Sequence, residues 1–376
     1  MLDSALKRRM GLDLDQSAMA PLSGLTVLDF STLLPGPFAS LMLAEAGARV
    51  IKIEPPRGDD MRRFPPMVGD SSAAFAALNH GKEFLSVDLK DPGALALLRP
   101  YLESADILLE QFRPGVMARL GLGYEAVSAI NPRLVYCSIT GYGQTGPRAH
   151  EAGHDLNYIS RTGMLSLSTG GSDRPTMPPL LAADIAGGSF PAVINILLGL
   201  RQRDLTGKGS YIDVAMADTP ASFAWHAVAT LAVSGRSPLD GQELFTGGSP
   251  RYRTYPTSDK RLVAVGALED KFWFGFCEAI GVPDPLRVPS APPKLVIDFI
   301  AQIIAAKPAR HWKAVLEPLD ICVCVVATLE EATADLHFTL RGLYARKATL
   351  PDGTEVPRAF VPLADGYRRD SDKSGK

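Results

Sequence analysis

The first half of the chain alternates between short apolar runs and amphipathic stretches. Residues 25–31 and 50–54 are apolar runs with the length of buried strands. Residues 38–45, between them, carry the apolar period of a helix that ends at Gly47. A strand, loop, helix and strand in succession form the building block of a parallel sheet. The same alternation predicts a helix over 91–103 and strands over 106–110 and 133–140. The first half therefore predicts an α/β sheet domain.

The second half changes character part-way along. Its pattern predicts a helix over 185–203, a strand over 210–215 and a helix over 217–233. Residues 241–258 are rich in Gly, Pro, Ser and Thr, and we expect a loop there. Beyond it the pattern predicts a strand over 262–266, a helix over 270–280, a proline-rich linker over 282–293, a helix over 294–316 and a strand over 321–328.

These elements predict two domains. We expect a large α/β domain over residues 1–215, to which residues 330–376 return, and a smaller domain over residues 225–325. The length of 376 residues is ample for two domains. The tail from Asp370 is short, polar and charged, so we expect it to be disordered.

Composition narrows the class of protein. The chain is 46% hydrophobic, which is enough for a full core, and 39 basic against 41 acidic residues leave a net charge of −2. That balance lacks the basic footprint of a nucleic-acid binder. Asp184 and several glycines and prolines interrupt the apolar run 179–200, so we expect no membrane span. With no signal-peptide pattern at the N-terminus, we expect a cytoplasmic location.

The four cysteines do not predict a disulfide framework or a metal site. They are few and irregularly spaced, at Cys137, Cys277, Cys322 and Cys324. Cys322 and Cys324 fall in an apolar run that reads as a buried strand, where cysteine acts as a small apolar side chain. Further metal ligands at suitable spacing are missing from the neighbouring sequence.

A glycine motif follows the strand at 133–140. Residues 141–146 read Gly-Tyr-Gly-Gln-Thr-Gly, which has the spacing of a dinucleotide-binding loop. Pro147 and the residues after it lack a helical apolar period, and no acidic residue stands on a following strand at the distance that ribose binding requires. We therefore interpret the motif as a flexible loop at the carboxyl end of a strand.

Arginines follow two of the predicted strands. Arg113 and Arg119 come after the strand at 106–110, and Arg57 comes after the strand at 50–54. The planar guanidinium suits phosphate because it donates two hydrogen bonds in parallel. Spacing alone leaves a solvated surface role equally open.

His154 and Asp184 are the main candidates for proton-transfer chemistry. His154 stands between Gly153 and Asp155 soon after the glycine loop, and Asp184 interrupts an apolar run. A structural histidine and a helix N-cap are the alternative readings, and a cap and a functional carboxylate are compatible. Glu269 follows the strand at 262–266, where it caps a helix or orients an imidazole.

Several segments together resemble the class III CoA-transferase (CaiB/BaiF) family, and most closely its α-methylacyl-CoA racemase branch. They occur in order over about residues 22–345. The segments are Leu-Ser-Gly-Leu-Thr-Val-Leu-Asp-Phe (22–30), Leu-Pro-Gly-Pro-Phe (34–38), Gly-Ala-Arg-Val-Ile-Lys-Ile-Glu-Pro-Pro (47–56), Leu-Asn-His-Gly-Lys (78–82), Phe-Arg-Pro-Gly (112–115), Gly-Tyr-Gly-Gln-Thr-Gly-Pro (141–147) and Gly-Lys-Gly-Ser-Tyr-Ile-Asp-Val-Ala-Met (207–216).

The resemblance implies a Rossmann-like large α/β domain and a smaller α+β domain in an interlocked homodimer. It also implies an acyl-CoA substrate, with coenzyme A as part of that substrate and no prosthetic group. The residues implied for binding it are Arg113, Arg119, Arg57, Lys82, Gly141, Tyr142, Gly143 and Tyr158. Some relatives have arginine where this chain has Pro55, and we expect Arg57 to substitute for it.

The resemblance also implies catalytic residues. Asp184 matches the catalytic aspartate of the family, His154 matches the histidine of the racemases, and Glu269 matches the acid that supports this histidine. Asp155 belongs to the same His-Asp-x-Asn-Tyr segment, and we include it with the catalytic group.

Three functions follow as hypotheses. The first is epimerisation of a 2-methylacyl-CoA, because inverting a carbon centre needs two proton-transfer groups on opposite faces of an enolate. The second is transfer of CoA between carboxylic acids with Asp184 as the nucleophile, which leaves the histidine unexplained. The third is an inactive CoA-binding or scaffold protein, which the presence of both His154 and Asp184 argues against.

Overall fold

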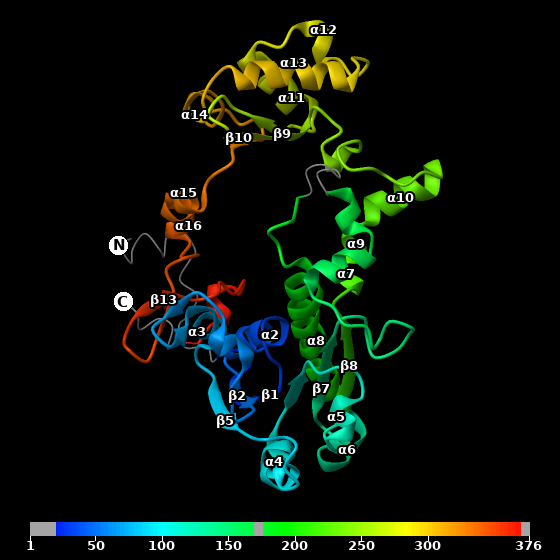
Figure 1. The fold of residues 1–376 in the computed structure, drawn as a ribbon, viewed down its shortest axis with the longest axis vertical. Helices are drawn as coiled ribbons and strands as arrows, with labels where there is room; N and C mark the ends of the chain where they lie inside the picture. The colour runs from blue at the N-terminus through cyan, green and yellow to red at the C-terminus, as the bar shows by residue number, and fades with distance from the viewer. Residues whose placement is uncertain (1–19, 169–175, 370–376) are drawn as a thin grey trace. The chain divides into compact units, whose positions relative to one another are not determined.

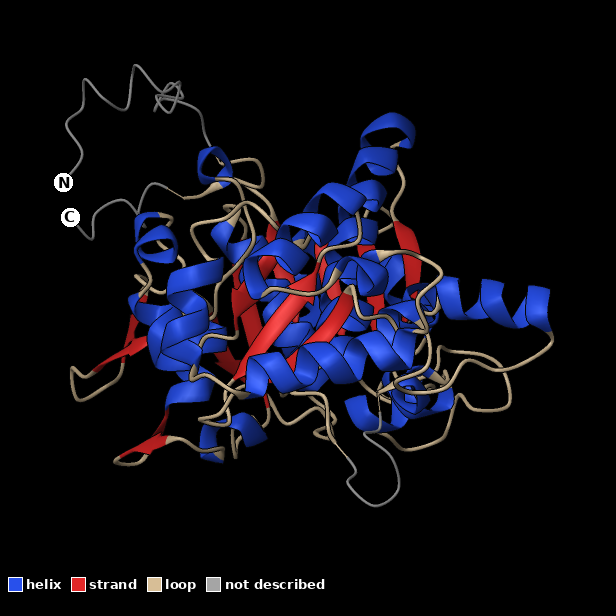
Figure 2. Ribbon diagram, turned by 90° about the horizontal axis from the view of Figure 1, so that it is seen from above, coloured by secondary structure: helices blue, strands red, loops and turns tan. Residues whose placement is uncertain are grey.

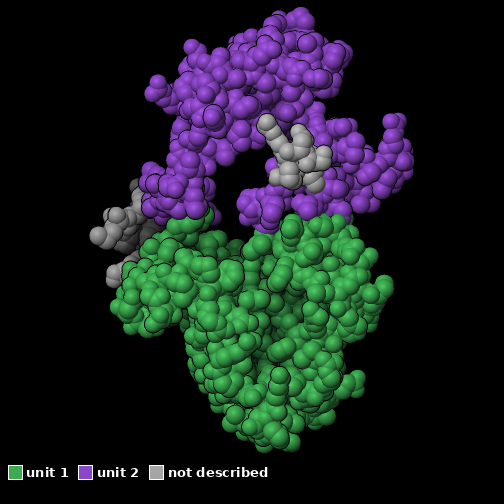
Figure 3. Space-filling model, viewed as in Figure 1, with its two compact units in different colours: residues 1–162, 181–220, 342–376 green, residues 163–180, 221–341 purple. Residues whose placement is uncertain are grey.

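The computed structural model describes residues 20–168 and 176–369, so the predicted disorder of the tail from Asp370 lies outside the described residues. The chain divides into two compact units (Figure 3). Unit 1 comprises residues 1–162, 181–220 and 342–376, and unit 2 comprises residues 163–180 and 221–341. The large unit thus takes in the C-terminal segment, and the 163–180 segment belongs with unit 2.

Unit 1 is built on a six-stranded parallel sheet (Figures 1 and 2). Its strands are β1 (Thr26–Asp29), β2 (Arg49–Glu54), β5 (Glu83–Ser86), β6 (Ile107–Glu110), β7 (Val135–Thr140) and β8 (Ser210–Ala215). Their order is β5-β2-β1-β6-β7-β8. The chain thus builds outward from β1 to β5, then returns to place β6 beside β1. Ligands of such doubly wound sheets bind at this reversal, beyond the carboxyl ends of the strands.

Helices cover both faces of the sheet. The helices α4 (Ala94–Ser104), α5 (Val116–Arg119) and α6 (Tyr124–Ile130) share a core with Tyr136 of β7. The helix α8 (Phe190–Thr206) packs against Val135, since a Cβ at Gly199 would lie 3.0 Å from that side chain. Consecutive strand residues point to opposite faces, so α8 lies on the other face. The helix α2 (Pro35–Glu45) contacts α8 there.

Shorter elements complete unit 1. They are η1 (Asp60–Arg63), the β3 (Met67–Val68) and β4 (Ser71–Ser72) hairpin, α3 (Ala73–Asn79), α7 (Asp155–Arg161), the π-helix η3 (Ala182–Ser189), the β12 (Lys347–Thr349) and β13 (Glu355–Pro357) hairpin and η5 (Asp365–Tyr367). The helix α9 (Asp218–Phe223) runs across the boundary with unit 2.

Unit 2 has its own core around a three-stranded antiparallel sheet. Its strands are β9 (Tyr252–Pro256), β10 (Leu262–Gly266) and β11 (Val323–Val325), in the order β11-β10-β9. The helices α11 (Asp270–Ile280), α13 (Pro293–Ala305) and α14 (Ala309–Leu316) contribute to the same core. Unit 2 also contains η2 (Met164–Leu167), α10 (Trp225–Ser234), η4 (Leu244–Thr246), α12 (Asp284–Arg287), α15 (Leu329–Ala334) and α16 (Leu336–Leu340).

Several sequence predictions were wrong in detail. The helix expected over 294–316 is two helices separated at Pro308, because proline has no N–H to donate within a helix. The loop expected over 241–258 contains strand β9, and the strand β5 was missed because its residues are largely exposed. Cys322 and Cys324 are exposed, since β11 buries only its alternate residues Val323 and Val325.

Within the described residues, the continuous helix Ala182–Thr206 is long and apolar enough to cross a membrane by length and composition alone. This segment consists of η3 and α8, and α8 contacts β7 and β8. Its apolar character therefore fits a helix that packs on the sheet of unit 1.

Candidate active site

A pocket of about 420 Å³ opens in unit 1 at the reversal of the strand order. The segments that line it follow strands β1, β6 and β7. Leu33 and Pro35 come from the loop after β1, and Gln111, Phe112 and Arg113 come from the loop after β6. Parallel strands that end at the same edge bring these loops together. The pocket also takes in His154 and Asp184, which are thirty positions apart in the sequence.

Asp184 enters the pocket from η3. The carboxylate of Asp155 holds the start of this π-helix, because its Oδ1 accepts hydrogen bonds from the N–H of Ala183 (2.6 Å) and of Asp184 (2.9 Å). Asp155 is only 5% exposed and does not line the pocket. In this structure Asp155 positions the backbone of Asp184, and its place among the catalytic residues stays a prediction.

Close backbone contact sets the path of η3. A Cβ at Gly187 would lie 2.3 Å from the carbonyl oxygen of Met216, so only glycine allows this approach. Met216 directly follows β8 and lines the same pocket. The glycines after Asp184, seen in the sequence as interruptions of an apolar run, are thus required by packing against the end of β8.

The carboxyl group of Asp184 has an unusual environment. Burial, and then the charge of Asp155, raise its pKa to about 6, although His154 opposes the shift. A carboxylate that is poised close to neutral pH can both take up and release a proton during turnover. The influence of His154 on this pKa also indicates that the two groups share one electrostatic environment.

His154 lies at the N-cap of α7 with its side chain exposed and lining the pocket. Its backbone N–H donates to Oδ1 of Asn157 over 3.0 Å, which fixes the turn that presents the imidazole. His154 and Asp184, the two candidates for proton transfer, therefore both line one cavity.

Tyr158 forms part of the wall beside them. Its hydroxyl donates to the carbonyl of Gly153 over 2.6 Å, and its ring meets that of Tyr142 edge to face at 5.2 Å. A Cβ at Gly141 would lie 2.6 Å from this ring, so the first glycine of the loop makes room for the tyrosine. Burial and the nearby Asp184 charge raise the pKa of Tyr158 to about 12, which keeps the hydroxyl protonated.

The rest of the glycine loop is held to β8. Gly143 has a φ of 85°, in the left-handed region that favours glycine, and the N–H of Gln144 donates to Asp213 over 2.9 Å. The next helix, α7, begins only at Asp155. The dinucleotide-binding motif requires a loop that leads directly into a helix, and this loop does not.

The basic residues predicted to bind CoA do not all lie at the pocket. Arg113 is exposed and lines the pocket, whereas Arg119 is exposed in the last turn of α5. Arg57 is exposed, and its guanidinium lies 3.6 Å from the carboxylate of Asp60. Lys82 is fully buried, and its amine donates to the carbonyl of Pro37 (2.9 Å). Burial lowers the pKa of this amine to about 7, and Lys82 does not line the pocket of His154 and Asp184, so its contact with CoA stays a prediction.

Glu269 belongs to unit 2, where it is exposed at the N-cap of α11. His154 and Asp184 belong to unit 1. The structure brings the histidine and the aspartate together within one unit, and the role of Glu269 beside His154 stays a prediction.

Leu33 and Gln111 line the pocket and were not singled out from the sequence. Only their position could have indicated them, since each lies in a loop that follows a strand next to the reversal of the strand order. That reversal became visible only when β1 and β6 were found to be neighbours.

Residues 22–370 match the family described as CoA-transferase family III. The chain is 35% identical to α-methylacyl-CoA racemase from Homo sapiens, over 86% of this chain and 82% of the relative. The chain belongs to the class III CoA-transferase family. It is also 36% identical to acetyl-CoA:oxalate CoA-transferase from Acetobacter aceti, over 83% of this chain and 82% of that protein.

The fold agrees with this assignment. A CaiB/BaiF family protein from Brucella suis has a crystal structure that superposes with a TM-score of 0.77 at 29% identity, covering 92% of this chain and 93% of that chain. An acyl-CoA substrate is consistent with the class III CoA-transferase family. Racemase and transferase relatives have similar identities to this chain, so similarity alone gives the class of enzyme and leaves the reaction open.

Proposed function

We propose that this class III family member racemises 2-methylacyl-CoA thioesters at carbon 2. The observation that carries the proposal is the presence of His154 and Asp184 in one pocket, with His154 acting on the pKa of the carboxyl group. Inversion of a carbon centre next to a thioester needs a base on one face and an acid on the other.

The reaction proceeds in two proton transfers. The Asp184 carboxylate removes the proton from carbon 2, and the electron pair moves into the thioester carbonyl to give an enolate. Protonated His154 then donates its proton to the opposite face, and the thioester carbonyl is restored. The reverse reaction exchanges the two roles. Each positioned group contributes roughly 10²–10⁴-fold to the rate.

The enolate oxygen needs hydrogen-bond donors. The N–H groups of Ala183 and Asp184 already donate to Asp155, so they are engaged. We propose that the backbone around Gly141, which lines the pocket, faces the thioester instead. Arg113 lines the same pocket and is exposed, which suits a contact with a CoA phosphate.

A second candidate is CoA transfer, which the raised pKa of the Asp184 carboxyl and the transferase relatives favour. Here Asp184 attacks the thioester carbonyl, releasing CoA thiolate and forming a mixed anhydride. The thiolate then attacks the aspartyl carbonyl, which frees the first acid and leaves CoA on Asp184. An acceptor carboxylate displaces this CoA to form a new anhydride, and the thiolate takes the new acyl group. Asp184 is thereby regenerated.

Proton exchange separates the two reactions. We expect incubation of the protein with (2R)- or (2S)-2-methylacyl-CoA in D₂O to place deuterium at carbon 2 with loss of chirality, observed by NMR. Asp184→Ala should abolish the exchange, and His154→Ala should slow it by roughly 10²–10⁴-fold because one positioned acid is lost.

Other outcomes point elsewhere. An absence of exchange, together with passage of CoA to an added carboxylate, would make Asp184 a nucleophile and overturn the racemase proposal. An absence of both reactions, with binding of acyl-CoA retained, would favour the inactive CoA-binding protein.

We also propose that the enzyme acts as a homodimer. Leu197 and Leu198 on α8 are exposed apolar side chains in unit 1, and Leu205 on the same helix is exposed as well. Apolar surface of this kind is typical of a face that a partner covers. We expect Glu269 to complete the site beside His154 in the assembled enzyme, as the resemblance implies.

A further inference from the structure

The loop Ser31–Gly36, which follows β1, has an unusual backbone at Leu33. Its φ of 60° lies in the left-handed region, which branched and bulky side chains rarely adopt. Leu33 lines the pocket that holds His154 and Asp184. A residue in this conformation persists only where its surroundings hold it, so the contacts of the loop indicate what maintains the pocket wall.

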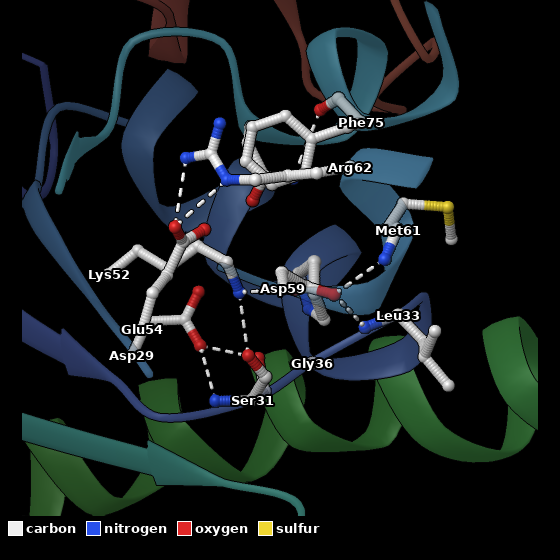
Figure 4. Close-up of polar contacts among 12 residues, drawn as sticks. Asp29, Ser31, Leu33, Gly36, Lys52, Glu54, Asp59, Met61, Arg62 and Phe75 are labelled. Atoms are coloured by element: carbon white, nitrogen blue, oxygen red, sulfur yellow. Dashed lines mark hydrogen bonds and ion pairs between the residues drawn. The ribbon is translucent and has the colours of Figure 1, made fainter. Parts of the chain in front are cut away.

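A buried ion pair holds the loop at its centre (Figure 4). Nζ of Lys52 lies 3.0 Å from Oδ2 of Asp59, and these side chains are 0% and 1% exposed. Oδ1 of Asp59 accepts from the N–H of Leu33 (3.3 Å), and Nζ of Lys52 donates to the carbonyl of Ser31 (2.6 Å). The pair thus binds the backbone of the loop at two points around Leu33.

The ends of the loop are fixed as well. At the start, the carboxylate of Asp29 accepts from the N–H of Ser31 over 2.9 Å and also from its hydroxyl. Burial alone would raise the pKa of Asp29, but the charges of Lys52 and Lys82 hold it below its ordinary value. At the other end, Oε1 of Gln111 accepts from the N–H of Gly36 over 2.9 Å.

The first residues of α2 offer few hydrogen-bond donors to a ligand. Pro35 and Pro37 have no N–H, and that of Gly36 donates to Gln111. The N–H of Phe38 donates to the carbonyl of Leu34. The start of this helix therefore contributes apolar shape to the pocket, through Leu33 and Pro35, and does not contribute an anion site.

Stability alone does not explain a buried pair at this place. Replacing such a pair with apolar residues of similar volume is often neutral or stabilising, because removing two charges from water is costly. Here each member of the pair also holds a backbone group of the loop. The pair therefore contributes to the geometry of the loop.

We infer that the Lys52–Asp59 pair positions Leu33, and that this left-handed residue sets the apolar wall of the acyl-CoA pocket. The inference rests on the proposed function, since it takes the ligand of the pocket to be an acyl-CoA. Lys52 and Asp59 act through Leu33 and are positioning residues.

The test measures binding without turnover. The probe is S-isobutyl-CoA, a thioether that cannot form an enolate, titrated calorimetrically into the full-length protein. The variant Lys52→Met with Asp59→Asn removes both charges together and so leaves no unpaired buried charge. We expect its Kd to rise by about tenfold or more, because small misplacements of a positioning segment are costly.

A matched control neutralises an equally buried pair elsewhere. At the far end of α2, Glu45 forms an ion pair with Arg368, whose side chains are 3% and 5% exposed, and a second one with the less buried Arg346. The variant Glu45→Gln with Arg368→Met tests the general cost of losing a buried pair. We expect its Kd to stay close to that of the wild-type protein.

A double-mutant cycle then tests the route of action. Leu33→Gly removes the side chain from the wall and adopts the left-handed backbone without strain. It should weaken binding by itself, and neutralising the Lys52–Asp59 pair in the Leu33→Gly background should add little. Additive effects would show that the pair does not act through Leu33 and would overturn the inference.

The remaining outcomes are distinguishable. A wild-type protein that does not bind S-isobutyl-CoA would overturn the proposed function, and the inference with it. A wild-type protein that binds the probe, with the Lys52–Asp59 variant folded and binding equally well, would overturn the inference alone. If the variant Lys52→Met with Asp59→Asn does not fold, the double-mutant cycle is carried out with Asp59→Asn alone and Leu33→Gly.

Discussion

Asp184 illustrates how position changes the chemistry of a single residue. Its carboxyl group is partly buried, lies near the charge of Asp155 and faces the pocket that His154 lines. Burial disfavours the ionised form, so the pKa rises to about 6. An aspartate in water is a weak base, and this shift makes Asp184 a stronger one close to neutral pH.

The shift predicts an acidic limb in the pH profile. In the direction in which Asp184 removes the proton, the carboxyl group must be ionised. Activity should therefore rise as the pH increases through about 6 and fall about tenfold for each unit below it. The measurement is kcat/KM for deuterium exchange against pH. His154→Asn should be slower, with the limb moved to higher pH, because His154 opposes the rise in the pKa of the Asp184 carboxyl group. A limb that persists in the residual activity of Asp184→Asn would assign it to another group.

At the scale of elements, the pocket is built from the loops at the ends of strands and from the start of η3. The loops after β1 and β6 meet because these strands are neighbours, although the chain builds β2 and β5 between them. The π-helix η3 is held at its start by a carboxylate from α7, which directly follows His154. One short segment therefore supplies the imidazole and anchors the element that carries the carboxylate.

This link predicts a strong effect of Asp155 on catalysis. Asp155→Ala leaves the N–H groups of Ala183 and Asp184 without their acceptor, which should cost about 1–3 kcal/mol of stability. Displacement of Asp184 should also lower kcat by about tenfold or more. Thermal unfolding and steady-state kinetics measure the two effects. Asp155→Asn keeps an acceptor oxygen and serves as the control. Equal kinetics for Asp155→Ala and the wild-type protein would exclude the positioning role.

At the scale of the whole molecule, unit 1 leaves part of its longest helix uncovered. On α8, Leu198 is 63% exposed and Ile194 is 57% exposed, although the other side of the helix packs on the sheet. A single chain thus exposes apolar area on the helix that directly follows the π-helix η3. We attribute this surface to the proposed homodimer.

The proposal predicts dissociation on introducing charge. Leu198→Glu should convert a dimer to monomers in light scattering and reduce activity, because a buried unpaired carboxylate destabilises an interface. Leu97→Glu on α4, where the leucine is 51% exposed, is the comparison variant and should leave the assembly unchanged. A wild-type protein that is monomeric at working concentrations, or a Leu198→Glu variant that remains dimeric, would contradict this interface.

Particular residues show how far sequence reasoning reached. The alternation of apolar runs predicted the strands β1, β2, β6 and β7 with boundaries within two residues. His154 and Asp184 were selected from their unusual neighbours, a glycine loop and an apolar run, and the structure places both at one pocket. Lys82 was expected to bind CoA from the resemblance, and only the structure shows that its side chain is buried beside Asp29.

The sequence by itself determined the periodicity of the elements, the parallel α/β character of the first half and the family, since these depend on local patterns and ordered motifs. Only the tertiary structure decided which strand ends meet, what shifts the pKa of Asp184 and which buried charges hold Leu33. Hydrophobic period is a local property of the chain, whereas burial, electrostatic coupling and strained backbone depend on neighbours that are distant in sequence.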